Sequence, residues 1–105
     1  MPSTTASTSI DGGRNVTAGT TVDFTTAVST VTMVIYRTGT VTGGVVVMEA
    51  SQDGTNWVPV TSVSIDRGVN DHRDATGGAF RYWRANVAAA ITGGGTITAT
   101  FMEAG

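Results

Sequence analysis

The chain has 105 residues, a net charge of −2 and a pI near 5.0, and it contains no Leu, no Lys and no Cys. This length fits one domain that buries roughly 60–70% of its unfolded surface. The acidic balance argues against nucleic acid or an anionic membrane as a partner. Without Cys, the chain has no disulfide or thiolate–metal site, which suits folding in a reducing cytoplasm.

The composition favours β-structure throughout. Val and Thr dominate the chain, and both are β-branched residues that favour strands, whereas the strong helix formers Leu and Lys are missing. No window is apolar enough to cross a membrane, and the N-terminus lacks the basic and apolar regions of a signal peptide. We therefore expect an all-β protein with almost no helix.

Residues 1–10 are mostly Ser, Thr and Ala, which is too polar for a core strand. They predict an extended N-terminal arm, followed by a β-sandwich domain over residues 11–105. Such a polar arm is ordered most easily by lying on a neighbouring subunit. The arm residues expected at that interface are Thr4, Thr5, Thr8 and Ile10.

The rest of the chain alternates short apolar runs with turns of Gly, Asn and Asp. The expected strands cover residues 22–26, 31–37, 45–50, 57–63, 80–89 and 96–102. With the less certain runs, this gives about seven or eight strands, which is the count of an antiparallel jelly-roll sandwich.

Four local patterns refine the assignment of strands and turns. Val31, Met33 and Ile35 should share one face of their strand, and Thr32, Val34 and Tyr36 the other. The run 45–50 is apolar on both faces, which predicts a central strand. Pro59 has no N–H to donate, so its strand should lie at an edge or a bulge. Asp53-Gly54 is expected to form a two-residue hairpin turn, because Gly tolerates the positive φ of such turns.

Residues 66–79 form the one long polar stretch and are expected to be a loop. Two interpretations are open for its acids. Four hard oxygen ligands could hold calcium, or the neighbouring Arg67 and Arg73 could neutralise the carboxylates. The spacing lacks a known calcium pattern, so we favour an ion-paired loop and expect no metal or cofactor. The candidate ligands are Asp66, Asn70, Asp71 and Asp74.

The inventory of catalytic residue types is poor. His72 is the only histidine, and no Gly-x-Ser-x-Gly turn offers it a nucleophile. Glu49 and Glu103 are the only glutamates, and Glu103 is at the end of the chain, so a carboxylate pair for glycoside hydrolysis is not expected. The run Gly93-Gly94-Gly95 has no Lys after it to bind phosphate. We predict that the protein is not an enzyme.

The strand Phe80-Arg81-Tyr82-Trp83-Arg84 also has two interpretations. In the first, one face is core and the other carries an arginine–aromatic stack on the outside of the sheet. In the second, Arg81 and Trp83 form an exposed anchor, because Trp, Tyr and Arg dominate interface hot spots. The Trp57 side chain is expected to be buried in the core.

The pair of motifs Ser51-x-Asp53-Gly54-x-x-Trp57 and Arg81-Tyr82-x-Arg84 resembles a pair found in discoidin-type jelly rolls. This resemblance implies a sandwich with ligand-binding loops at one end, and in many such domains the ligand is a sugar or a lipid.

The whole chain resembles small tailed-phage virion proteins more broadly. The shared features are a Ser/Thr-rich start, a body rich in Val, Thr and Gly, the Asp-Gly-x-x-Trp hairpin, and a last strand ending at the C-terminus. The resemblance implies a capsid decoration, or cement, protein that sits on the capsid exterior after synthesis in the host cytoplasm. Its partners would be the major capsid protein and itself, as a dimer or trimer.

The expected function is therefore structural, with lower-ranked contact candidates in the arginine strand and the polar loop. These candidates are Arg81, Trp83, Asp71 and Arg73. The alternative is a carbohydrate-binding β-sandwich module on a virion tail or surface appendage, for which Trp57 or Trp83 would have to be exposed beside a concave face.

Overall fold

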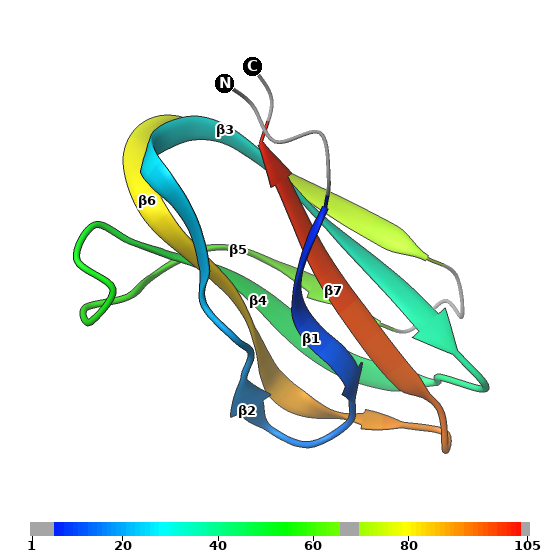
Figure 1. The fold of residues 1–105 in the computed structure, drawn as a ribbon. Coiled ribbons are helices and arrows are strands. Elements are labelled where there is room, and N and C mark those ends of the chain that lie inside the picture. Colours follow the sequence, from blue (N-terminus) through cyan, green and yellow to red (C-terminus); the bar gives the residue numbers. More distant parts are fainter. Residues whose placement is uncertain (1–5, 66–69, 104–105) are drawn as a thin grey trace.

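The computed structural model describes residues 6–65 and 70–103, and over these ranges the chain is antiparallel β-sheet without helix (Figure 1). Accordingly, no helix able to cross a membrane exists in the described ranges. The all-β prediction is confirmed. The strands are β1 (Ser7–Gly13), β2 (Thr17–Ala18), β3 (Val22–Thr38), β4 (Gly43–Ser51), β5 (Val58–Ser64), β6 (Asp71–Thr92) and β7 (Thr96–Glu103).

The seven strands form one hydrogen-bonded sheet that folds back on itself into two layers. The long strands β3 and β6 bend together, so each contributes one half to each layer (Figure 1). The first layer has the order β1-β7-β3-β6, with the C-terminal half of β3 and the N-terminal half of β6. The second has β2 and the start of β3, then the C-terminal half of β6, then β4 and β5. Counting β2 with the start of β3, each layer has four strands, which is the jelly-roll arrangement.

The bend in β3 and β6 is built by residues that break the regular strand. The pairing of the two strands shifts register on either side of Val28, and Thr25 and Gly78 have φ values of 67° and 77°. An Asp23 carboxylate oxygen accepts the Thr25 N–H at 2.8 Å, and the Arg81 guanidinium clamps the same carboxylate with bonds of 2.7 and 2.9 Å. Arg81 of β6 thereby holds the bend of β3 in place.

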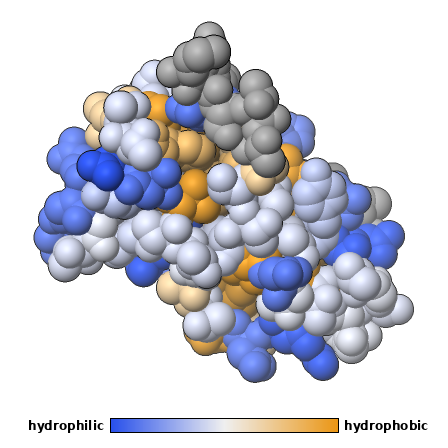
Figure 2. All heavy atoms as spheres, in the orientation of Figure 1, coloured by the Kyte–Doolittle hydropathy of each residue, from blue (hydrophilic) through white to orange (hydrophobic). Residues whose placement is uncertain are grey.

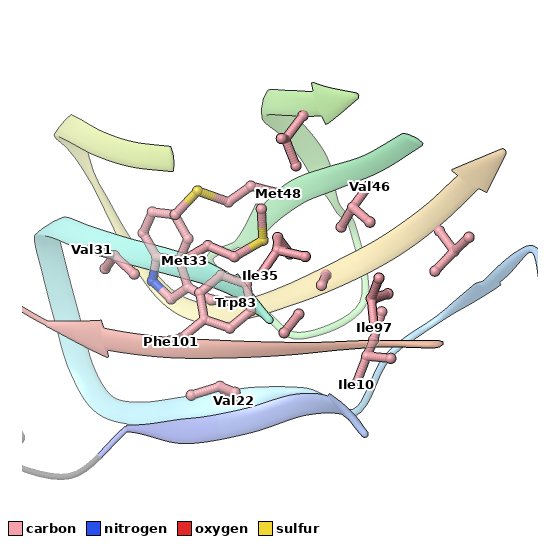
Figure 3. Close-up of a cluster of buried hydrophobic side chains, with 14 of the residues drawn as sticks. Ile10, Val22, Val31, Met33, Ile35, Val46, Met48, Trp83, Ile97 and Phe101 are labelled. Carbon is pink, nitrogen blue, oxygen red and sulfur yellow. The ribbon is translucent and has the colours of Figure 1, made fainter. Parts of the chain in front are cut away.

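The hydrophobic core lies between the two layers (Figure 3). Val31, Met33 and Ile35 all point into it, which confirms that they share one face. Trp83 is 1% exposed; its ring meets Phe80 edge-on at 5.8 Å, and its indole N–H donates to the Phe80 carbonyl at 3.1 Å. Burying a large side chain of this kind contributes about 1.5–3 kcal/mol, so the inner faces account for most of the stabilisation.

Residues 7–10 are not an arm, because they form most of β1 and pair with β7. Ile10 is buried in the core, and Ser9 is 4% exposed. The Ser9 hydroxyl donates to the Thr20 carbonyl at 2.7 Å and accepts the Ala85 N–H at 3.0 Å. The polar residue Ser9 can therefore be buried here, because two hydrogen bonds satisfy its hydroxyl. Thr4 and Thr5, also predicted for the arm, lie outside the described residues.

The loop expected over residues 66–79 is also wrong from Asp71 onward, because Asp71–Thr92 is one continuous strand. Its first part pairs with residues 30–35 of β3, and only Ala75 is buried there, so the run is polar without being a loop. The Arg73 guanidinium donates to the Ser62 carbonyl of β5 at 3.1 Å. This bond links the edges of the two layers on one side of the sandwich, as Ser9 does on the other.

The predictions for the β4–β5 pair are confirmed. β4, which contains residues 45–50, lies between β5 and β6. β5 is an edge strand, and its register shifts by one residue next to Pro59.

Candidate functional site

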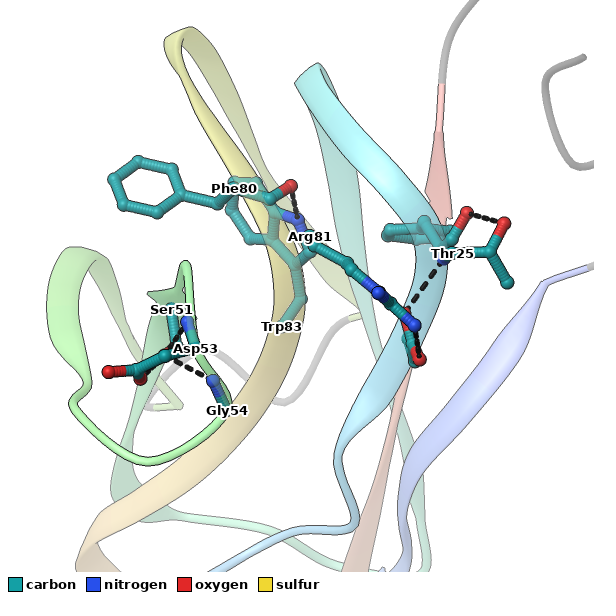
Figure 4. A network of polar contacts seen from close by, with 9 residues as sticks. Thr25, Ser51, Asp53, Gly54, Phe80, Arg81 and Trp83 are labelled. Carbon is teal, nitrogen blue, oxygen red and sulfur yellow. Dashed lines mark hydrogen bonds and ion pairs between the residues drawn. The ribbon is translucent and has the colours of Figure 1, made fainter.

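The connection between β4 and β5 is a tightly hydrogen-bonded loop (Figure 4). Strand β4 ends at Ser51 and β5 begins at Val58, so the predicted two-residue hairpin turn is wrong. Gly54 does have a positive φ, 78°. The Asp53 carboxylate accepts the backbone N–H groups of Thr55 and Asn56, both at 2.8 Å. It also accepts the Asn56 amide at 2.7 Å and the Ser51 hydroxyl at 3.0 Å.

These bonds change the acidity of Asp53. The backbone N–H groups of Asn56 and Thr55, followed by the Asn56 side chain and the Ser51 hydroxyl, hold the pKa of the Asp53 carboxyl well below its usual range. The carboxylate is thus a structural acceptor for its own loop. Near neutral pH the carboxyl group is deprotonated, so it cannot act as a proton donor.

The two halves of the sequence motif meet in space. Gly54 lies against the Tyr82 ring, which would be 3.6 Å from a Cβ at that position. The Arg84 guanidinium stacks over the Trp57 ring at 4.1 Å and also binds Glu49 at 2.7 Å. Trp57 is half-buried on the outside of the sheet, so its predicted place in the core is wrong. The arginine–aromatic stack on the outer face, the first interpretation of this strand, is confirmed.

The same geometry decides between the two interpretations of Trp83 and Arg81. Trp83 is in the core, so it cannot be an exposed anchor. Arg81 lies at the surface, where it pairs with Asp23 and stacks on the Tyr82 ring at 5.0 Å. The hydrogen bond from Arg81 lowers the pKa of the Asp23 carboxyl. Arg81 remains a candidate contact residue, although its guanidinium already holds the bend.

A pocket of about 210 Å³ opens between the β4–β5 loop and the bend of β6. Figure 4 shows the Phe80 ring on the side of β6 that faces the loop. The Gln52 amide N–H donates to the Ala79 carbonyl at 3.1 Å and so joins the loop to β6 beside this pocket. The lining residues are Ala50, Ser51, Gln52, Asp53, Asn56, Val58 and Phe80.

The outer face of the first layer carries a broad array of hydroxyl groups, which we call the hydroxyl face. Registers place its residues in rows across the strands: Thr8 is beside Thr100, Thr100 is beside Val34, and Val34 is beside His72. The residues of the hydroxyl face are Thr8, Thr32, Val34, Tyr36, His72, Asp74, Thr98, Thr100 and Met102. In Figure 2 much of the visible surface is pale, the colour of intermediate hydropathy, and the strongly hydrophobic residues show as separate patches.

Polar and ionisable groups on and beside the hydroxyl face contact one another. His72 Nε2 lies 3.9 Å from an Asp74 carboxylate oxygen, and the Thr32 hydroxyl donates to Asp74 at 2.8 Å. Asp71 and Arg73, predicted as contact residues, form an ion pair at 3.2 Å. This pairing fits the ion-paired interpretation of the acids, although Asp66 and Arg67 lie outside the described ranges. Within those ranges, no three His, Cys, Asp or Glu side chains cluster as metal ligands would.

Of the predicted interface residues that the structure describes, only Thr8 belongs to the hydroxyl face, while Ile10 and Trp83 are interior. The residues that the prediction missed include two threonines of β7, Thr98 and Thr100. The alternation Thr96-Ile97-Thr98-Ala99-Thr100 was a usable signal, because in a strand it places every Thr on one side. Comparison with family models, with curated proteins and with solved structures finds no match to this chain.

Proposed function

We propose that this protein is a structural virion protein, a capsid decoration protein that attaches to the outer shell through its hydroxyl face. The observation that supports this proposal is the arrangement of Thr8, Thr100, Val34 and His72 side by side across the whole first layer. The resemblance to small tailed-phage virion proteins supplies the class of partner, the major capsid protein.

The hydroxyl face has the physical properties of a lasting contact surface. A Thr side chain has few rotamers, so ordering it at an interface costs less entropy than ordering Lys or Arg. Its methyl group offers apolar contact, and its hydroxyl can both donate and accept. The strands beneath are paired on both sides at β7 and at the second half of β3. Such a face is preformed before the partner arrives.

Attachment would stabilise the shell by mass action, because a ligand that binds only the assembled state shifts the equilibrium toward it. If the protein itself associates as a dimer or trimer, simultaneous contacts to neighbouring capsid subunits add avidity. No chemical step is needed for either effect.

The test is co-sedimentation of the purified protein with shells assembled from the major capsid protein of the same virus. We expect saturable binding, and Thr100→Lys should weaken it at least roughly tenfold, because a bulky ammonium at the centre of the face must be desolvated. Ser64→Lys is the matched control, since Ser64 is an exposed hydroxyl residue on the edge strand of the second layer. Equal binding by both variants and the parent protein would show that the hydroxyl face is not the contact.

The alternative function is a carbohydrate-binding module. Trp83 is buried, and the Arg84 guanidinium covers the Trp57 ring. Neither ring therefore forms the exposed aromatic platform that this function was expected to use. What favours it now is the pocket beside Phe80, which combines an aromatic ring with amide side chains.

A further inference from the structure

We propose that the pocket between the β4–β5 loop and Phe80 binds one ring of a neutral sugar. The pocket shares no residue with the hydroxyl face. The inference goes beyond shell attachment and does not depend on it.

The size of the pocket limits its ligand. Its volume is about 210 Å³, which is below the about 300–1,000 Å³ of sites that hold drug-sized molecules. A single small ring fits this space better than an extended chain. A longer glycan could therefore be recognised only through one of its residues.

The lining combines the two surfaces that a sugar ring needs. Val58 and Phe80 provide an apolar wall for the C–H face of the ring. Gln52 and Asn56 add amide groups, which both donate and accept hydrogen bonds, as sugar hydroxyls do. The Phe80 ring makes an edge-on contact with the buried Trp83, which supports this part of the wall.

The amide oxygens are free to accept from a ligand. Each amide uses its NH₂ group within the protein: Gln52 donates to the Ala79 carbonyl at 3.1 Å, and Asn56 donates to Asp53 at 2.7 Å. The oxygens of the same two amides have no hydrogen-bond partner among residues 6–65 and 70–103. The bonds that the NH₂ groups make restrict the rotation of both amides.

The electrostatics favour a neutral ligand. Asp53 is the charged residue of the lining, and its carboxylate is occupied by bonds from Thr55, Asn56 and Ser51. The nearby Arg84 is paired with Glu49. The lining offers no positive charge to an anionic ligand, and the hydrogen bonds that the Asp53 carboxylate already accepts leave it less able to bind a cation.

The loop that carries the amides is already ordered. Ser51 is 1% exposed, and its hydroxyl accepts the Gly54 N–H at 2.9 Å while donating to Asp53. A ligand would therefore bind without first ordering residues 52–57, which lowers the entropic cost of binding.

The experiment is an NMR titration of the ¹⁵N-labelled protein with the methyl glycosides of glucose, galactose, mannose and N-acetylglucosamine. We expect at least one of them to give saturable shifts of the backbone amides in residues 52–58 and 79–80. Gln52→Ala should weaken that binding roughly three- to tenfold, the worth of one hydrogen bond. Asn15→Ala is the control, because Asn15 is an exposed amide between β1 and β2 and should leave binding unchanged.

A second variant separates binding from folding. Phe80→Leu removes the ring but keeps an apolar side chain, so a variant that still melts cooperatively should have lost the saturable shifts. The proposal is wrong if none of the four glycosides gives saturable shifts, if the shifts lie elsewhere, or if both Gln52→Ala and Phe80→Leu bind as the parent does. It is also wrong if N-acetyl-valine amide occupies the pocket and the sugars do not, because the pocket would then receive a protein side chain. Co-sedimentation of Gln52→Ala with capsid shells should be unchanged. A loss of sugar binding can therefore be told apart from a loss of shell attachment.

Discussion

Ser9→Ala is the substitution that best probes how the N-terminal strand is held. The Ser9 hydroxyl donates to the Thr20 carbonyl at 2.7 Å and accepts the Ala85 N–H at 3.0 Å, and the Ala85 residue is fully buried. Alanine removes both bonds and leaves a buried N–H without an acceptor. The lost bond to Thr20 is worth about 0.5–1.5 kcal/mol, and the orphaned N–H costs about 1–3 kcal/mol.

The free energy of unfolding should therefore fall by about 2–4 kcal/mol for Ser9→Ala. At roughly 4–8 °C for each kcal/mol in a domain near this size, the melting temperature should fall by at least about 8 °C. Thermal melting followed by circular dichroism, and urea unfolding at constant m-value, would measure both quantities.

Thr8→Ala is the matched control, because the neighbouring hydroxyl points to solvent from the same strand. Its effect should stay within about 0.5 kcal/mol, or about 2 °C. If Ser9→Ala also melts within about 2 °C of the parent, the reasoning is refuted, and residues 7–10 behave as the arm that the composition suggested.

Three further predictions concern the β4–β5 loop and the stack beside it. Gly54→Ala should destabilise the protein by more than about 1 kcal/mol in urea unfolding, because Gly54 has a φ of 78°; an unchanged midpoint would mean that the loop can rearrange. The pKa of Asp53 is lowered in the folded state, so its stabilisation should be present above the usual Asp pKa near 3.9 and be lost progressively as the pH falls below it. Asp53→Asn should flatten that part of the stability–pH curve, and an identical curve would contradict the role of the carboxylate. Arg84→Ala should cost about 1–3 kcal/mol, because it leaves the partly buried Glu49 unpaired and uncovers Trp57; a red-shifted fluorescence maximum should accompany the loss, and neither change would be seen if the stack were absent in solution.

Much of the fold could be predicted from alternation. In β3 the buried residues Val31, Met33 and Ile35 are separated by outward residues, so both the strand and its core face are readable in the sequence. The central place of β4 followed from its apolar residues on both faces, and the edge position of β5 followed from Pro59. These features depend on burial of apolar side chains, which sequence reports directly.

The strands that sequence reasoning missed are held by backbone pairing. In β1 the residue Ser9 is interior because its hydroxyl is satisfied by hydrogen bonds, and no apolar pattern marks it. In the first part of β6 the neighbours of Ala75 are the exposed polar residues Asp74 and Thr76. Such strands depend on partners distant in the chain, so composition alone made them look like an arm and a loop.

The candidate site was readable only in part. Asp53-Gly54 and Arg84 stood out as a motif, but their roles as a loop acceptor and a cover for Trp57 depend on the pairing of β4 with β6. Thr8 and Thr100 become neighbours on the hydroxyl face only through the register in which β1 and β7 pair. A linear sequence does not contain that register.

The most direct test of the proposed function is the affinity of the protein for shells of its major capsid protein, measured for the parent, Thr100→Lys and Ser64→Lys. We expect saturable binding that Ser64→Lys retains and that Thr100→Lys weakens at least roughly tenfold, with both variants melting like the parent. Because the hydroxyl face carries few ionisable groups, the parent's affinity should also change little with salt. Absence of binding to the shell, or equal binding by both variants, would contradict the proposed function.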